Sequence, residues 1–240
     1  MVNADEEVFE MNNGRICRTA RGDLIRVLRG LTKALLALMF CFAAGSSPAR
    51  AHPHAWIDLR STVVLDAAGR VTAIEQHWLF DPIYTVFATE GLSDVADTRA
   101  EALTALARSN LQNLRSYDYF TEVRVGGAKV ALGTVSEVES ELREGHLWMR
   151  FVVPLAAPVD PTEQALTFAV FDPTYYIEIL HLPGDVVAFR GGEAGGCSGR
   201  VVPPNPSIDA VLLAQAMDRD ATPDATLGSV FAERVEVTCR

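Results

Sequence analysis

The first fifty residues carry an ordered pattern that limits which part of this chain can fold as a globular domain. A basic stretch from Arg15 to Lys33 precedes an unbroken apolar run at residues 34–44. Ala49-Arg50-Ala51 then provides the small-x-small pattern that signal peptidases cut. We therefore expect residues 1–51 to be a cleaved signal peptide, and residues 52–240 to form a single periplasmic domain.

The apolar run is too short to span a bilayer, which requires roughly 20 residues. An uncleaved membrane anchor or a buried helix is therefore the weaker interpretation, and Met11 is an alternative start of the chain. No later stretch is long and apolar enough to be a transmembrane helix, so we expect no membrane span in the mature protein.

The net charge of the chain indicates which classes of partner it can bind. The whole chain has a net charge of −10. Residues 1–51 hold seven Lys and Arg against five Asp and Glu, a net charge of +2, which leaves −12 for residues 52–240. Nucleic acid is a poor partner for such a domain, because phosphate contacts require Lys and Arg. The acidity suits cations or basic partners, and it also serves solubility alone.

The cysteine count is consistent with export. Cys17 and Cys41 fall in the predicted signal peptide, so only Cys197 and Cys239 remain. A single pair in an oxidising compartment indicates one disulfide, which would stabilise the fold by about 4 kcal/mol in the chain-entropy model. Thiolate ligation of a metal is the alternative, although structural thiolate sites usually contain closely spaced Cys pairs.

Short alternating segments dominate the rest of the chain. They predict strands over 55–65, 71–80, 120–132 (a hairpin), 135–142, 147–153, 165–171, 175–180, 186–189 and 230–238. Helical spacing predicts helices over 98–116 and 208–217, with Thr98 and Ser207 as N-caps. Residues 191–206 are rich in Gly and Pro and are expected to be loop. The pattern predicts an α+β fold, mainly antiparallel and sandwich-like, with two helices.

The candidate metal ligands lie at the expected new N-terminus, HPHAWID at residues 52–58. Side chains of an extended segment alternate between two faces, so His52, His54 and Asp58 share one face. Two imidazoles and a carboxylate are donors that zinc, nickel and cobalt accept. Cleavage after Ala51 would add the α-amino group of His52. Pro53 lacks a backbone N–H and therefore blocks the square-planar amino-terminal copper or nickel mode.

The other histidines give weaker indications. If residues 66 and 70 face each other across the first turn, His77 lies opposite Leu59 on the core side. A slip of one residue would move His77 to the face of His54, and the sequence leaves this open. We expect the two remaining histidines at the surface, His146 in a hairpin turn and His181 at a strand end.

Two stretches resemble each other, WLFDPIY at residues 78–84 and VFDPTYY at residues 170–176. The residue before a proline favours extended geometry, so Asp81 and Asp172 are each expected to end a strand. A strand-ending turn packed with core aromatics would explain both stretches without a ligand. Alternatively, these two carboxylates complete or steady the metal site.

Together, HPHAWID, WLFDPIY, FAVFDPTYY, a Cys in a Gly-rich loop and the terminal FAERVEVTC resemble domain-of-unknown-function family 1007. The resemblance covers essentially the whole predicted mature chain. The family is often described as a periplasmic component of an uncharacterised ABC-type transport system and is linked with nickel/cobalt-type transporters. The resemblance therefore implies transition-metal handling. The residues that match its motifs are His52, His54, Asp58, Asp81, Asp172, Tyr175 and Tyr176.

We predict a periplasmic accessory protein, not an enzyme, that passes a divalent transition metal (zinc, nickel or cobalt) to or from an inner-membrane metal transporter. The predicted ligands are His52, His54 and Asp58, with Asp81 and Asp172 nearby. The alternative is a module of an ABC-type transporter that binds a small solute or a metal chelate. A copper histidine-brace enzyme is less favoured, because it needs a third histidine near the first. A structural partner of the transporter without a ligand is also open.

Overall fold

The computed structural model describes residue 33 and residues 53–92, 95–184, 187–192, 196–216 and 226–240. Arg50–Arg240 form one compact unit, and the description below concerns that unit alone. The expected cleavage site and His52 lie outside the described residues. Within the described ranges, none of the helices is both long enough and apolar enough to cross a membrane.

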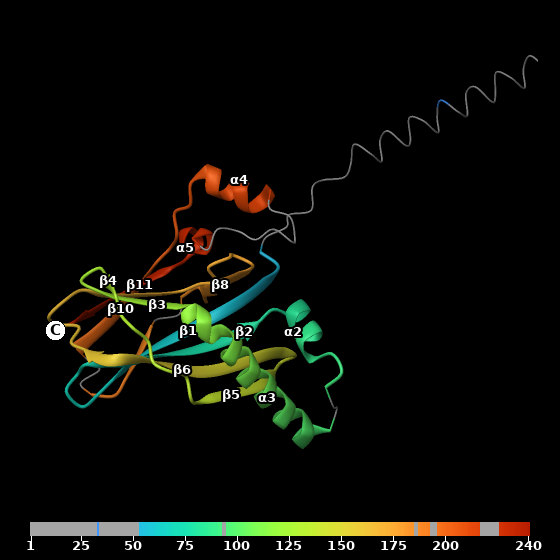
Figure 1. The fold of residues 1–240 in the computed structure, drawn as a ribbon, viewed down its shortest axis with the longest axis horizontal. Helices are drawn as coiled ribbons and strands as arrows, with labels where there is room; N and C mark the ends of the chain where they lie inside the picture. The colour runs from blue at the N-terminus through green and yellow to red at the C-terminus, as the bar shows by residue number, and fades with distance from the viewer. Residues whose placement is uncertain (1–32, 34–52, 93–94, 185–186, 193–195, 217–225) are drawn as a thin grey trace, which may run out of the picture. The chain divides into compact units, whose positions relative to one another are not determined.

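The larger sheet is built around its N-terminal strand (Figure 1). Its strands are β5 (Val138–Arg143), β6 (His146–Val159), β2 (Val71–Phe80), β1 (Ala55–Leu65), β8 (Ile177–His181) and β9 (Ala188–Arg190). The first four of these pair antiparallel in that order. On its other edge β1 pairs in parallel, first with β8 and then with β9. Strand β1 is therefore an interior strand of the sheet.

The smaller sheet is antiparallel throughout. In order, its strands are β10 (Cys197–Val202), β11 (Arg234–Cys239), β7 (Leu166–Val170), β3 (Thr121–Val125) and β4 (Ala128–Lys129). One hydrophobic core contains buried side chains of both sheets, among them Ile57, Trp78 and Phe151 of the larger and Phe168 and Val235 of the smaller. Burial of these large apolar surfaces is the main force that stabilises the fold.

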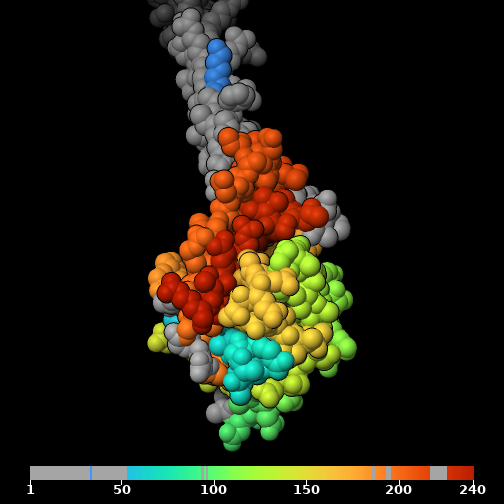
Figure 2. All heavy atoms as spheres, turned by 90° about the vertical axis from the view of Figure 1, so that its left-hand side faces the viewer, coloured from blue at the N-terminus to red at the C-terminus, as the bar shows by residue number. Residues whose placement is uncertain are grey.

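Helices lie beside both sheets (Figure 1). They are α2 (Pro82–Thr89), α3 (Ala96–Leu114), the 3-10 helix η1 (Arg115–Phe120), α4 (Ile208–Ala216) and α5 (Leu227–Phe231). Helix α3 packs near β5 and buries Leu103, Ala107 and Leu111 in the main core at helical spacing. Helices α4 and α5 instead form a small separate cluster with Tyr175. In Figure 2 the C-terminal residues, orange to red, extend over one side of the surface.

Several predictions of local structure are confirmed. The first two strands have the expected bounds, the fold is mixed and mostly antiparallel, and Ser207 accepts a hydrogen bond from the Ala210 N–H at 3.2 Å. Others are wrong. Helix α3, predicted over 98–116, starts at Ala96 without a side-chain cap, so Thr98 is not its N-cap. The region 191–206 contains strand β10, and α2 and α5 were not predicted, so the described residues hold four α-helices.

The register between β1 and β2 answers the question about His77. Asp66 and Arg70 do pair across the turn, where the Asp66 N–H donates to the Arg70 carbonyl at 2.9 Å. The register then shifts by one residue between Val64 and Leu65. A bulge of this kind adds one unpaired residue and moves every later side chain of the strand to the opposite face. His77 consequently lies opposite Arg60, on the outer face of the sheet.

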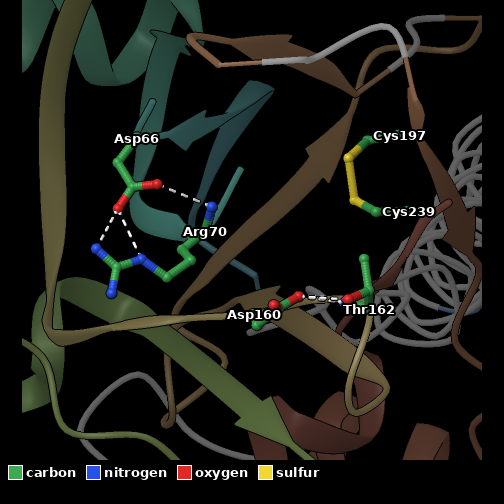
Figure 3. Close-up of a disulfide and its surroundings, with 6 residues drawn as sticks. All are labelled: Asp66, Arg70, Asp160, Thr162, Cys197 and Cys239. Carbon is green, nitrogen blue, oxygen red and sulfur yellow. Dashed lines mark hydrogen bonds and ion pairs between the residues drawn. A yellow bond between two sulfur atoms is a disulfide. The ribbon is translucent and has the colours of Figure 1, made fainter. Parts of the chain in front are cut away.

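The predicted disulfide is present (Figure 3). Cys197 and Cys239 lie directly opposite each other on β10 and β11, with their sulfur atoms 2.04 Å apart. Both sulfurs are therefore used in the covalent bond, and thiolate ligation of a metal is not available to them. The disulfide joins the two strands at the end of the smaller sheet.

Candidate functional site

Residues 53–58, 78–84 and 170–176, which belong to three of the motifs quoted above, meet at one end of the larger sheet, where β1 and β8 begin and β2 ends. The His54 N–H donates to the Tyr176 carbonyl at 2.8 Å, and the centroids of their rings are 4.6 Å apart. The Trp56 N–H donates to the Asp81 carboxylate at 2.9 Å. We call this region, defined by His54, Trp56, Asp81, Asp172 and Tyr176, the motif end.

Asp81 is the N-cap of helix α2. One carboxylate oxygen accepts the N–H groups of Ile83 at 2.8 Å and Tyr84 at 2.9 Å, and the other accepts the Trp56 N–H. Side-chain oxygens of an N-cap residue satisfy amide groups that have no partner within the helix. Asp81 therefore ties the start of α2 to the start of β1.

Asp172 likewise fixes backbone amides in the second motif, although strand β8, not a helix, follows it. One oxygen accepts the N–H and the hydroxyl of Thr174 at 2.9 and 2.8 Å, and the other accepts the Ile177 N–H at 3.0 Å. Ile177 begins β8 and lies beside Ala55 of β1. The resemblance between the two Asp-Pro stretches therefore has a structural basis, because each Asp holds the first residues of one of two adjacent parallel strands.

The sequence predicted three carboxylates as metal ligands or their neighbours, and the structure shows how each of them is placed. Both oxygens of Asp81 and Asp172 already accept hydrogen bonds from the protein. Asp58 lies on the outer face as expected and is exposed. It is four residues from His54, which along a strand is about 13 Å. Across the described ranges, no three His, Cys, Asp or Glu side chains are close enough to hold one metal ion.

A shallow groove of about 920 Å³ runs over the outer face of the larger sheet. Its lining includes Asp58, Arg60, His77, His146 and Trp148. His146 is half-buried instead of solvated, because its Nδ1 atom hydrogen-bonds the Phe80 carbonyl at 2.8 Å. A carbonyl oxygen can only accept, so Nδ1 of His146 carries the proton.

His181 is not a surface residue, as its side chain is only 6% exposed. It joins Ser61 and Glu233 in a hydrogen-bonded chain, with 2.9 Å from the Ser61 hydroxyl to Nε2 and 2.9 Å from Nδ1 to the Glu233 carboxylate. The order of groups resembles a nucleophile, base and acid. Ser61, however, is 3% exposed and shares the core-facing side of β1 with Leu59 and Val63, so we interpret the hydrogen-bonded chain as a link between the two sheets.

Two tyrosines of the motifs are held in their protonated form. Burial raises the pKa of Tyr84, and the nearby Asp81 and Tyr176 raise it further. Burial also raises the pKa of Tyr175, as do the charge and the hydrogen bond of Glu178, whose carboxylate accepts the Tyr175 hydroxyl at 3.1 Å. Glu178 belongs to no sequence motif, and only the pairing of β8 with β1 brings it to the motif end.

This chain is similar to proteins that are themselves uncharacterised. It is similar to an uncharacterised protein of Haemophilus influenzae, with 23% identity over 192 residues that cover 79% of this chain and 91% of the relative. It is also similar to an uncharacterised 15.5 kDa protein from the trpE 3′ region of Spirochaeta aurantia. That match has 28% identity and covers 39% of this chain and 66% of the relative. A family model described as protein of unknown function, DUF1007, matches residues 37–239, and the chain therefore belongs to the DUF1007 family.

Proposed function

We propose that this protein is exported to the periplasm and binds a divalent transition metal, zinc, nickel or cobalt, at the motif end. In this proposal it passes the metal to or from an inner-membrane metal transporter. The observation that supports it is the anchoring of His54. Its backbone is fixed to Tyr176 and its imidazole packs against the tyrosine ring, at the end of the sheet nearest to His52 in the sequence.

Preorganisation is the physical reason to connect this geometry with metal binding. A ligand held in place before binding loses less conformational entropy when the metal arrives. In our proposal His54 supplies one such imidazole, and His52 supplies a second imidazole and, after cleavage, an amine. Neutral imidazoles bind metals, so the affinity should fall as the pH drops through about 6.5, the unperturbed histidine pKa.

The proposal can be tested by calorimetric titration of zinc, nickel and cobalt into protein that begins at His52. A variant with His52→Ala and His54→Ala should lose tight binding. His146→Ala is the matched control, because this histidine lies on β6 and should leave the affinity unchanged. Metal binding by the double variant at parent affinity would refute the proposed site. One extra residue before His52 should weaken binding if the amine is a ligand.

A second candidate is a module that binds a small solute or a metal chelate. The groove of about 920 Å³ on the outer face of the larger sheet favours it, since binding sites for small molecules have volumes of roughly 300–1,000 Å³. In that case Asp58→Asn would weaken solute binding, whereas replacing His52 and His54 would not.

A further inference from the structure

The carboxylate best placed to join His54 in the proposed metal site belongs to a residue outside the sequence motifs. In the parallel pairing, Trp56 lies beside Glu178. The backbone bond from His54 to Tyr176 continues this register by one step. His54 and Glu178 are therefore diagonal neighbours on adjacent strands, and both alternate onto the outer face.

Strand geometry gives the separations that decide between the carboxylates. Neighbouring strands lie about 4.8 Å apart and each residue advances about 3.3 Å, so the Cα atoms of His54 and Glu178 are roughly 8 Å apart. The corresponding distance from His54 to Asp58 is about 13 Å. Metal–ligand bonds are only about 2.0–2.2 Å long for imidazole nitrogen and carboxylate oxygen. The side chains of His54 and Glu178 can thus meet at one ion more readily than those of His54 and Asp58.

The contacts of Glu178 also suit a ligand. One of its oxygens accepts the Tyr175 hydroxyl, and Tyr175 precedes it by three residues, so the side chain extends toward the start of β8 and the motif end. Among the described residues, only Tyr175 donates a hydrogen bond to this carboxylate, so its second oxygen is available. Carboxylates that bind metals are commonly oriented by a hydrogen bond of this kind. Asp81 and Asp172, in contrast, use both oxygens to hold backbone amides.

We infer that Glu178 is the carboxylate ligand of the metal site, with His54 beside it. Asp81 and Asp172 then act as positioning residues, which hold the starts of β1 and β8 side by side. This inference rests on the proposed function, since it assigns the ligands of the same site. It replaces Asp58 by a residue that the sequence alone does not bring near His54.

The experiment compares the parent protein, beginning at His52, with Glu178→Gln and the matched control Asp58→Asn. Zinc, nickel and cobalt are titrated calorimetrically, and bound cobalt is also followed by its visible absorption. We expect Glu178→Gln to weaken binding at least about tenfold, in the range found when the groups supporting a metal are lost, and to change the cobalt spectrum. Asp58→Asn should keep the parent affinity and the parent spectrum.

The possible outcomes separate the two proposals. If the parent binds none of the three metals, the proposed function and this inference both fail. If the parent binds but Glu178→Gln matches it in affinity and spectrum, only the assignment of Glu178 is wrong. Urea unfolding of the metal-free proteins shows whether the variant keeps its fold. Should Glu178→Gln unfold, Glu178→Asp, which keeps the charge on a shorter side chain, must still change the cobalt spectrum, and an unchanged spectrum would overturn the assignment.

Discussion

Glu75 offers the sharpest prediction about stability. Its side chain is 8% exposed on the outer face of the larger sheet, and it accepts hydrogen bonds from Arg150 at 2.7 Å and His77 at 3.0 Å and pairs with Arg190. Burial alone would raise the pKa of this carboxyl. The hydrogen bonds from Arg150 and His77 and the charges of Arg150 and Arg190 outweigh burial and lower the pKa from 4.5 to about 2.

The lowered pKa of Glu75 determines how much this carboxylate adds to the free energy of unfolding and over which pH range it does so. One pKa unit corresponds to 1.36 kcal/mol, so the difference between 4.5 and about 2 amounts to about 3 kcal/mol. The folded state holds this carboxylate ionised more strongly than the unfolded chain does. Its contribution to the free energy of unfolding is therefore present above pH 4.5 and is lost as the pH falls toward 2.

We expect Glu75→Gln to lower the free energy of unfolding by about 3 kcal/mol at pH 7, measured by urea denaturation. The difference from the parent should fall to less than half of that value at pH 3. Glu139→Gln is the matched control, because Glu139 pairs with the same Arg150 at 2.9 Å but is 63% exposed. An exposed pair should contribute less than about 1 kcal/mol. Equal losses from both variants, or a difference that persists unchanged at pH 3, would contradict this reasoning.

Two further predictions concern the disulfide and the close packing of Gly228 against the backbone of Asp172. Replacing Cys197 and Cys239 by Ser opens a link between residues separated by 42 positions, which should cost about 4 kcal/mol and lower Tm by roughly 8–16 °C in a thermal scan. An unchanged Tm would show that the disulfide does not stabilise the fold. Gly228→Ala should lose at least about 1–3 kcal/mol in urea denaturation, because a Cβ atom there would clash with the Asp172 carbonyl oxygen. Parent-like stability of this variant would mean that α5 can move away from the Asp172 turn without cost.

Local patterns predicted the parts of the fold that depend on neighbouring residues. The alternation from Ala55 to Leu65 predicted both the bounds of β1 and the core-facing position of Leu59. The cysteine pair was correct because only two cysteines follow the signal-like segment, which leaves a single connectivity. These features need no knowledge of how distant segments meet.

Features set by distant contacts could not be predicted in the same way. The face of His77 depends on one bulged residue next to the first turn, and a turn assignment alone gives the opposite face. Strand β10 was not predicted, because its segment is rich in glycine and becomes extended only by pairing with β11. Glu178 comes near His54 only because β8 pairs with β1. The sequence thus singled out motifs whose residues lie together at the motif end, but the distances between their side chains depend on how the strands pair.

The position of β1 inside the larger sheet has a consequence for the order of folding. Its antiparallel partner β2 follows after a short turn, whereas its parallel partner β8 begins at Ile177. Contacts between residues so far apart in sequence form slowly, because a long loop must close first. Until β8 arrives, one edge of β1 presents unpaired backbone groups that can pair with another chain. A fragment ending before Ile177 should therefore aggregate, since the larger sheet is complete only when β8 and β9 have paired with β1.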